Sequence, residues 1–164
     1  MTATSPPELG ERAPSFSART HHGESITLEH LGGAPALLMF YPFAFSAVCG
    51  SELRSLALRS DEIREIGATV LAISCDSLHS LRAYAESLRI GGEELPFSLV
   101  SDFWPHGQMA GSFGVFDSER GTAQRTSVLL DPQLRVAHLQ SVPNAQARNL
   151  DETLSVLAGL RGRS

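Results

Sequence analysis

The chain has 164 residues and 42% of them are hydrophobic, which is enough to bury one core without disulfides or a structural metal. We therefore expect a single domain over residues 1–164. The 13 basic residues are all arginines and stand against 18 acidic ones, giving a formal net charge of −5. Because the arginines are scattered and the chain is acidic, nucleic acid and membrane surfaces are not expected as partners.

The chain has two cysteines, Cys49 and Cys75, which form no Cys-x-x-Cys motif. They are too few for a disulfide-built secreted scaffold, so we expect both thiols to be reduced. Residues 1–5 do not resemble a secretory leader, and no apolar run reaches the roughly 18 residues of a membrane span. These features predict a soluble cytoplasmic protein. The six histidines form no i, i+4 pair, so no metal site is expected.

The first half of the chain predicts a hairpin, a strand and a helix in that order. Phe16–Arg19 and Ser25–Leu28 flank a turn of His and Gly residues, as in a short β-hairpin. Ala36–Tyr41 is an uninterrupted apolar run between two prolines, which is typical of a strand buried on both faces. Apolar residues then recur at helical spacing over residues 47–66, and Gly67 is a C-cap residue.

In the second half, strands and helices continue to alternate. Thr69–Ser74 predicts a second buried strand, and Leu78–Leu88 an amphipathic helix followed by two glycines. Three more strands are expected at Phe97–Val100, Ser127–Leu130 and Arg135–Leu139, and an Asp-Pro turn joins the last two. A final helix is expected at Leu150–Ala158. This order predicts an α/β three-layer domain with a mixed central sheet and helices on both faces, as in thioredoxin-like folds.

The segment YPFAFSAVCGSE, at the predicted strand-to-helix transition, carries the most chemical information. Pro42 fixes the backbone as the strand ends, and Ser46 is a good N-cap residue, so Cys49 falls in the first helical turn. There the free N–H groups and the positive end of the helix dipole favour the reactive thiolate. No acidic residue between Pro42 and Ser51 opposes this effect.

Taken alone, this cysteine has a structural interpretation as well. Free cysteines are among the most buried residues, so Cys49 on its own is compatible with a small hydrophobic core residue and Ser46 with a simple cap. A serine hydroxyl can also accept from a backbone N–H while it donates to the sulfur or to a substrate oxygen. The surrounding motifs favour the functional interpretation.

Pro42, Ser46 and Cys49 match the Pro-x-x-x-Thr/Ser-x-x-Cys motif, and the chain resembles the peroxiredoxins, thiol peroxidases of the thioredoxin fold. The resemblance extends in the expected order from Gly10 to about Leu139. It is carried by the segments GERAPSFSA, LLMFYPFAF, LVSDFWPHGQMAGSFGVF and RTSVLLDPQLRV.

The resemblance implies a role for each residue of the motif. Cys49 would be the peroxidatic cysteine, Pro42 would shield it, and Ser46 would hydrogen-bond the peroxide. Arg125 would stabilise the thiolate and the transition state, and Glu52 would orient this arginine. The chemistry agrees, because cleavage of an O–O bond by a thiolate needs donors and a fixed positive charge near the oxygen that gains charge. No metal, haem or flavin cofactor is implied.

The phrase SDFWPHG and the lack of a C-terminal Val-Cys-Pro segment resemble the alkyl hydroperoxide reductase E type, a one-cysteine branch. This implies reduction of hydrogen peroxide or organic hydroperoxides, with the Cys49 sulfenic acid reduced by an external thiol or redoxin. Phe43 and Phe45 would form an apolar mouth for the pocket. Ser46 replaces the commoner Thr and lacks its methyl group, so the hydroxyl is expected to be held less rigidly.

Two further residues have open interpretations. Cys75 follows a strand next to the active strand, but a disulfide needs Cα atoms within about 7 Å, which favours a structural cysteine over a resolving one. Position 54, where some relatives carry a resolving cysteine, is Arg54. Trp104 is expected in the core or in a dimer contact, since peroxiredoxin dimers often use that region. A homodimer is therefore expected.

Two other functions remain as alternatives to the peroxidase. One is a redox sensor whose partner binding changes when Cys49 is oxidised, without turnover. The other is a noncatalytic holdase or structural dimer, although packing alone does not need a Pro, Ser, Cys, Glu and Arg set.

Overall fold

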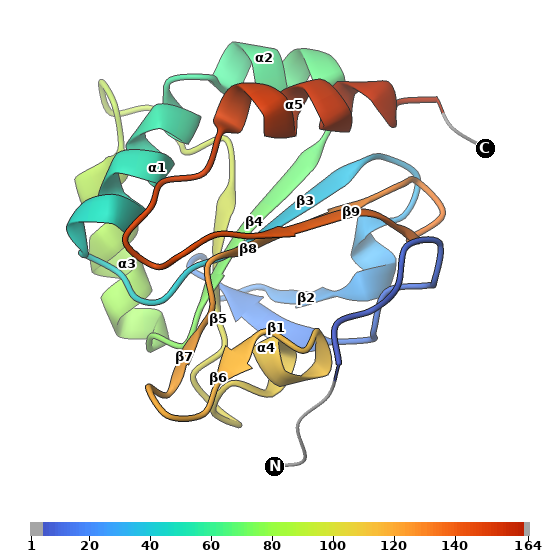
Figure 1. The fold of residues 1–164 in the computed structure, drawn as a ribbon. Helices are drawn as coiled ribbons and strands as arrows, with labels where there is room; N and C mark the ends of the chain where they lie inside the picture. Colours follow the sequence, from blue (N-terminus) through green and yellow to red (C-terminus); the bar gives the residue numbers. More distant parts are fainter. Residues whose placement is uncertain (1–4, 163–164) are drawn as a thin grey trace.

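A mixed sheet of seven strands lies at the centre of the computed structural model, which describes residues 5–162 (Figure 1). The strands, in the order β2-β1-β5-β4-β3-β8-β9, are β1 (Ser17–Thr20), β2 (Ser25–Thr27), β3 (Ala36–Phe40), β4 (Thr69–Ser74), β5 (Ser98–Ser101), β8 (Thr126–Leu130) and β9 (Val136–Ser141). β3, β4 and β5 pair in parallel, and the other pairs are antiparallel. Residues 1–4 and 163–164 lie outside the described residues, so the predictions for the first five residues and for both ends of the domain fall partly outside them.

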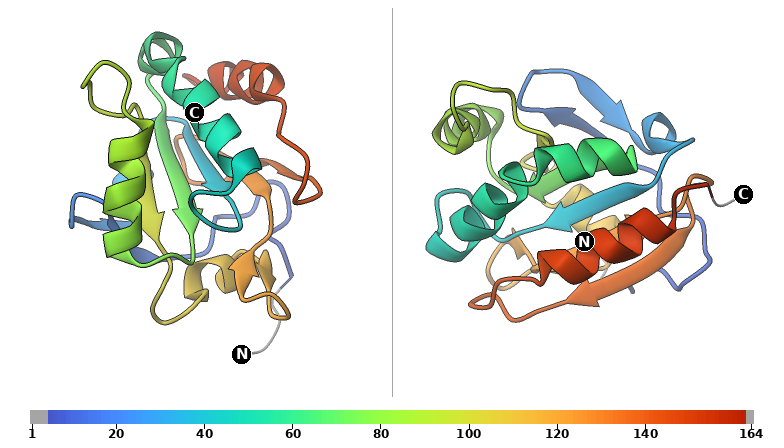
Figure 2. Two further views of the ribbon diagram at one scale, coloured as in Figure 1. Left: turned by 90° about the vertical axis from the view of Figure 1, so that its left-hand side faces the viewer. Right: turned by 90° about the horizontal axis from the view of Figure 1, so that it is seen from above.

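Helices cover both faces of this sheet, as the sequence predicts. The elements are η1 (Leu28–Leu31), α1 (Ala47–Ala57), α2 (Ser60–Ile66), α3 (Leu78–Leu88), α4 (Gln108–Ser112) and α5 (Leu150–Gly159), with a separate hairpin of β6 (Phe116–Asp117) and β7 (Thr122–Ala123). Figures 1 and 2 show α1, α2 and α5 on one side of the sheet, and Figure 1 shows α4 on the other.

The alternation of side chains along β3 divides the interior into two apolar clusters. Leu37 and Met39 pack with residues of α1, α2, α3 and α5. Leu38 and Phe40 point to the opposite face, where they pack with residues of η1 and with Phe113 at the end of α4. All five residues of β3 are fully buried, which explains why this strand reads as an uninterrupted apolar run.

Several predicted elements differ from the observed ones. The single helix expected over residues 47–66 is two helices, because the chain leaves helical geometry at Arg59, with φ −107° and ψ 28°. No glycine or proline marks this break, and the Arg59 side chain binds both Glu62 and Asp151. The short elements η1, α4 and β6–β7 were not predicted, since each is too short to show a period.

Candidate active site

The active-site loop, which we define as residues 42–46, joins β3 to α1. The Tyr41 N–H still donates to the Ile73 carbonyl at 3.0 Å, and Pro42 then ends the strand because it has no N–H to donate. Ser46 is the N-cap of α1, and its Oγ accepts the N–H of Cys49 at 3.3 Å. The predicted capping role of Ser46 is therefore confirmed. Accepting this bond leaves the hydroxyl hydrogen for another partner.

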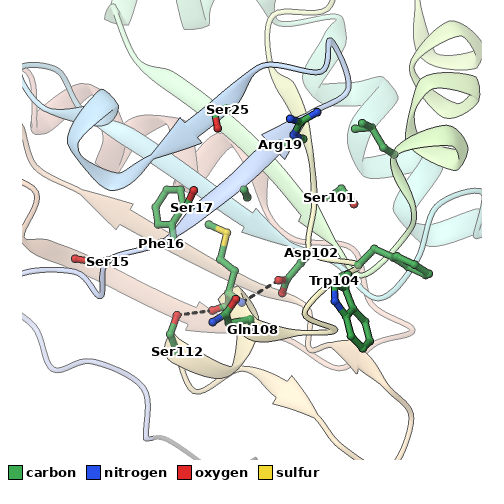
Figure 3. A pocket seen from close by; sticks show the side chains of 14 residues that line it. Ser15, Phe16, Ser17, Arg19, Ser25, Ser101, Asp102, Trp104, Gln108 and Ser112 are labelled. Atoms are coloured by element: carbon green, nitrogen blue, oxygen red, sulfur yellow. Dashed lines mark hydrogen bonds between the residues drawn. The ribbon is translucent and has the colours of Figure 1, made fainter.

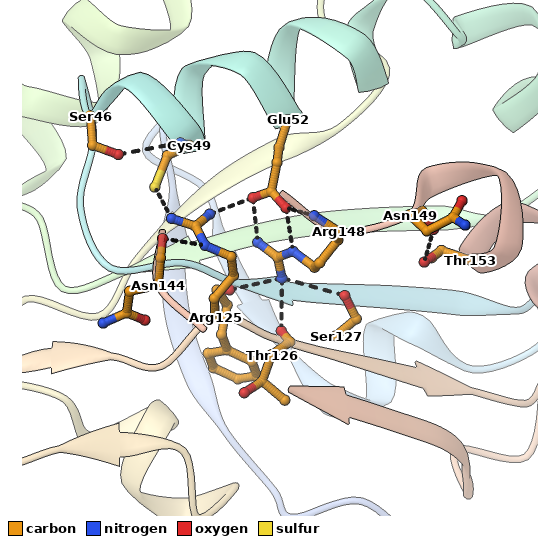
Figure 4. Close-up of polar contacts among 11 residues, drawn as sticks. Ser46, Cys49, Glu52, Arg125, Thr126, Ser127, Asn144, Arg148, Asn149 and Thr153 are labelled. Carbon is orange, nitrogen blue, oxygen red and sulfur yellow. Dashed lines mark hydrogen bonds and ion pairs between the residues drawn. The ribbon is translucent and has the colours of Figure 1, made fainter. Parts of the chain in front are cut away.

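Arg125 reaches Cys49 from the other end of the sequence (Figure 4). It lies directly before β8, the antiparallel neighbour of β3, so its side chain starts at the same edge of the sheet as the active-site loop. Its Nη2 donates to the Cys49 Sγ at 3.1 Å, and its Nε donates to the Asn144 carbonyl at 3.1 Å. Both Cys49 and Arg125 are almost fully buried.

Glu52 lies one helical turn beyond Cys49 and therefore on the same face of α1. Its Oε1 accepts a hydrogen bond from the Arg125 Nη1. This arrangement leaves Nη2 directed at the sulfur, as Figure 4 shows. The structure thus brings Ser46, Cys49, Glu52 and Arg125 together, as the sequence predicts.

Arg148 completes the cluster and was missed by the sequence analysis. Its Nε donates to Glu52 Oε2 at 2.9 Å, its Nη2 to Oε1 at 3.0 Å and its backbone N–H to Oε2 at 2.6 Å. Its Nη1 binds the carbonyls of Phe40 and Thr126 at 2.9 and 3.0 Å. Arg148 directly precedes Asn149, the N-cap of α5, and no pattern in the sequence distinguishes it from a solvated arginine.

The buried cluster around Cys49 contains more positive than negative charge. Burial would raise the pKa of the Glu52 carboxyl, but the hydrogen bonds and charge of Arg148, together with the charge of Arg125, hold that pKa below its usual value. One carboxylate then faces two guanidinium groups, all more than nine-tenths buried. A net buried charge is costly. The Arg125 guanidinium that contacts Cys49 therefore favours an anionic group beside it.

A pocket of about 210 Å³ opens beside the cluster. It is lined by Pro42, Phe43, Ser46, Ala47, Val48, Arg120, Thr122, Arg125 and Asn144. Phe43 is half exposed here, as expected for an apolar mouth. Phe45 does not line the pocket; instead its ring packs on Tyr84, with the centroids 4.7 Å apart. The prediction for Phe45 was therefore wrong, because its left-handed backbone, with φ 67°, separates it from Phe43.

The family model for the AhpC/TSA family matches residues 9–139, which is most of the chain. The chain belongs to this family. It is thus a peroxiredoxin, a thiol-dependent peroxidase, as the motif predicts.

Individual relatives agree with this assignment. The chain is 33% identical over 124 residues to alkyl hydroperoxide reductase E of Mycobacterium tuberculosis, covering 75% of this chain and 78% of that protein. A probable peroxiredoxin of Caenorhabditis elegans is 37% identical over 123 residues; the match covers 74% of this chain and 54% of that longer protein.

Solved structures share the fold. Reduced 2-Cys peroxiredoxin of Plasmodium vivax has a TM-score of 0.81 at 27% identity, covering 93% of this chain and 81% of that one. AhpC of Enterococcus faecalis has a TM-score of 0.82 at 24% identity, covering 92% and 90%. The predicted thioredoxin-like α/β fold is confirmed.

The second cysteine of this peroxiredoxin has the properties of an unreactive thiol. Cys75 is 7% exposed, and neither Cys75 nor Cys49 is in a disulfide. Burial, with a smaller contribution from the Asp102 carboxylate, raises the pKa of Cys75 to about 12. At neutral pH this group is almost entirely protonated, which agrees with the structural interpretation.

Trp104 of the peroxiredoxin lies on the surface, so of the two expected positions the core is wrong, and the dimer contact stays a prediction. It is 84% exposed, and neighbouring Phe103 is half exposed. Both line a second pocket of about 740 Å³, which lies between β1, the end of β5 and α4 (Figure 3). Trp104 follows the β5 strand end in a turn that precedes α4, so its ring is directed away from both apolar clusters.

Residues 5–162 of the peroxiredoxin contain neither a cluster of metal ligands nor a membrane-spanning helix. No group of three His, Cys, Asp or Glu residues in this range could hold a metal ion. No helix in the same range is long and apolar enough to cross a membrane.

Proposed function

We propose that this peroxiredoxin reduces hydrogen peroxide and organic hydroperoxides through a sulfenic acid on Cys49. The observation that carries this proposal is the 3.1 Å contact between Arg125 Nη2 and Cys49 Sγ beside an open pocket. The name of the mycobacterial relative, an alkyl hydroperoxide reductase, supports organic hydroperoxides as a substrate class.

The reaction is a displacement on oxygen. The thiolate sulfur attacks one peroxide oxygen, the O–O bond breaks, and the other oxygen leaves with its electron pair and takes up a proton as water or alcohol. Cys49 then carries the sulfenic acid. The Ser46 hydroxyl and the Arg125 guanidinium supply donors for the developing negative charge, while Pro42 lines the pocket and shields the sulfur from bulk water.

The cycle closes through an external thiol or a redoxin. That thiol attacks the sulfenic sulfur and releases water, and a second thiol then reduces the mixed disulfide and frees Cys49. Cys75 is a poor resolving group because its thiol is buried and protonated.

Two properties of the whole protein belong to the proposal. A homodimer is supported by the exposed Trp104 and Phe103, since large aromatic side chains are enriched at interfaces. A cytoplasmic location is supported by two free cysteines, which match a reducing compartment. Light scattering at micromolar concentration tests the dimer, and cell fractionation tests the location.

The decisive experiment compares the wild type, Cys49→Ser and Cys75→Ser in stopped-flow reactions with peroxide. The wild type and Cys75→Ser are expected to consume peroxide, turn over with added thiol, and form a dimedone adduct on Cys49 by intact mass. Cys49→Ser is expected to be inactive but folded, because an alcohol is not ionised at neutral pH. Rapid oxidation of Cys49 with no turnover on any supplied thiol or redoxin would favour the sensor.

A further inference from the structure

A carboxylate outside the catalytic cluster holds the main chain of the active-site loop. Asp76 lies between β4 and α3, directly before Ser77, the N-cap residue of α3. Its Oδ2 accepts the N–H of Ala44 at 2.8 Å and the hydroxyl of Ser74 at 2.7 Å. The Asp76 carbonyl in turn accepts the Ser101 hydroxyl at 2.7 Å, so the residue is fixed from two neighbouring strands.

The backbone of the active-site loop is strained, so it needs contacts such as the hydrogen bond from Ala44 to Asp76 to keep its conformation. Phe45, between Ala44 and the N-cap Ser46, has φ 67°, a left-handed conformation that a non-glycine residue rarely adopts. Such a conformation persists only where surrounding contacts fix it. Two contacts do so here: the Asp76 bond to Ala44 and the packing of the Phe45 ring on Tyr84.

The geometry of the loop affects the peroxide more than the sulfur. The loop carries Phe43 and Ser46, which line the pocket, whereas Arg125 binds the sulfur from its position directly before β8. A displaced loop therefore misplaces the Ser46 hydroxyl but leaves the guanidinium at the thiolate.

We infer that Asp76 is a positioning residue for peroxide reduction, which acts by fixing Ala44 and thereby Ser46 above the reacting thiolate. It touches neither the sulfur nor the pocket. This inference rests on the proposed function of Cys49.

The test compares Asp76→Ala with Asp76→Asn and measures two rates at Cys49 in each. One is the reaction with peroxide, and the other is alkylation by iodoacetamide, which needs the thiolate but no peroxide-binding groups. Asp76→Ala is expected to lower the peroxide rate about tenfold, the effect of losing one hydrogen bond to a charged acceptor, with no matching fall in alkylation. Asp76→Asn keeps an oxygen that can accept the Ala44 N–H and is expected to restore most of the ratio of the two rates.

Ser77→Ala is the matched control. Ser77 is the adjacent residue and the N-cap of α3, where its Oγ accepts the Ser80 N–H at 3.2 Å. Its loss weakens the same helix end by about the usual cost of a cap but removes no bond to the loop, so the rate ratio should stay at the wild-type value. Hydrogen exchange of the Ala44 amide should speed up in Asp76→Ala and not in Ser77→Ala.

An unchanged rate ratio in Asp76→Ala would overturn the inference, as would equal falls in both rates. Should that variant fail to fold, Asp76→Glu, which moves the carboxylate by one methylene, is expected to lower the ratio in the same way, and an unchanged ratio there would be equally decisive. The proposed function fails separately, if wild-type Cys49 does not react rapidly with peroxide.

Discussion

The Sγ of Cys49 lies 3.1 Å from the Nη2 of Arg125, although the two residues are 76 positions apart in the sequence. Both side chains are almost fully buried, so little solvent screens the attraction between a thiolate and the guanidinium. The fold thus supplies the positive charge that the helix N-terminus alone would provide only in part.

Replacement of Arg125 by Ala is expected to slow peroxide reduction by roughly two orders of magnitude, the scale of losing one preorganised donor. Arg125→Lys should recover only part of the rate, because a point charge cannot bind Glu52 and the sulfur in the same planar geometry. Stopped-flow oxidation and alkylation of Cys49 at neutral pH measure both effects. Wild-type alkylation in Arg125→Ala would show that the guanidinium does not stabilise the thiolate.

The Glu52 carboxyl should make stability depend on pH in acid. Its pKa in the folded protein is below the ordinary value of a glutamate, so its contribution to stability is complete above that ordinary value and is lost as pH falls through the lower folded pKa. Urea denaturation from pH 6 to pH 3 should show this loss, and Glu52→Gln should flatten the profile in that window. If stability fell equally steeply with pH in the wild type and in Glu52→Gln, the acid dependence would not come from the Glu52 carboxyl.

Arg148→Ala should destabilise the fold by roughly 3–5 kcal/mol, the usual cost of breaking a buried ion pair. It removes two side-chain bonds to Glu52 and those to the carbonyls of Phe40 and Thr126, whereas the bond from the backbone N–H of residue 148 to Glu52 stays. Urea denaturation measures the cost, and Arg64→Ala, at an exposed ion pair of α2, is the control that should change stability by less than about 0.5 kcal/mol. An equally small change in the free energy of unfolding of Arg148→Ala would mean that the buried ion pair of Arg148 and Glu52 does not stabilise the fold.

Cys75 should resist modification while the protein is folded. With its pKa raised to about 12 by burial, about one thiol in ten thousand is ionised at pH 8. The Cys49→Ser protein should therefore take up iodoacetamide very slowly in buffer and rapidly in urea, as followed by intact mass. Fast labelling in buffer, or a Cys49–Cys75 disulfide in the oxidised wild type, would restore the resolving role that we assign to an external thiol.

The sequence predicted those features of the site that depend on local backbone chemistry. Pro42 and Ser46 end a strand and begin a helix through their own bonding properties, so the placement of Cys49 followed directly. The pairing of Glu52 with Arg125 was predicted from the motif and is observed.

The missed features depend on packing between distant segments. Arg148 binds Glu52 across 96 positions, and neither residue type nor spacing indicates such a contact. The break at Arg59 has no local breaker, and it coincides with a salt bridge to Asp151 in α5. Trp104 was expected in the core or in a dimer contact because large aromatic side chains are usually placed for buried area, and the turn before α4 leaves it exposed in the single chain.

The position of Arg148, after the last strand of the sheet, has a consequence for the newly made chain. During synthesis Cys49 is added long before Arg125, and Arg125 is added before Arg148. Arg148 is the residue that binds Glu52, the carboxylate partner of Arg125. An incomplete chain therefore carries an ordinary thiol with no guanidinium beside it, and heightened reactivity toward oxidants arises only on completion of the fold. The reactive site is thus assembled only after Arg148, the last of its residues in the sequence, has been synthesised.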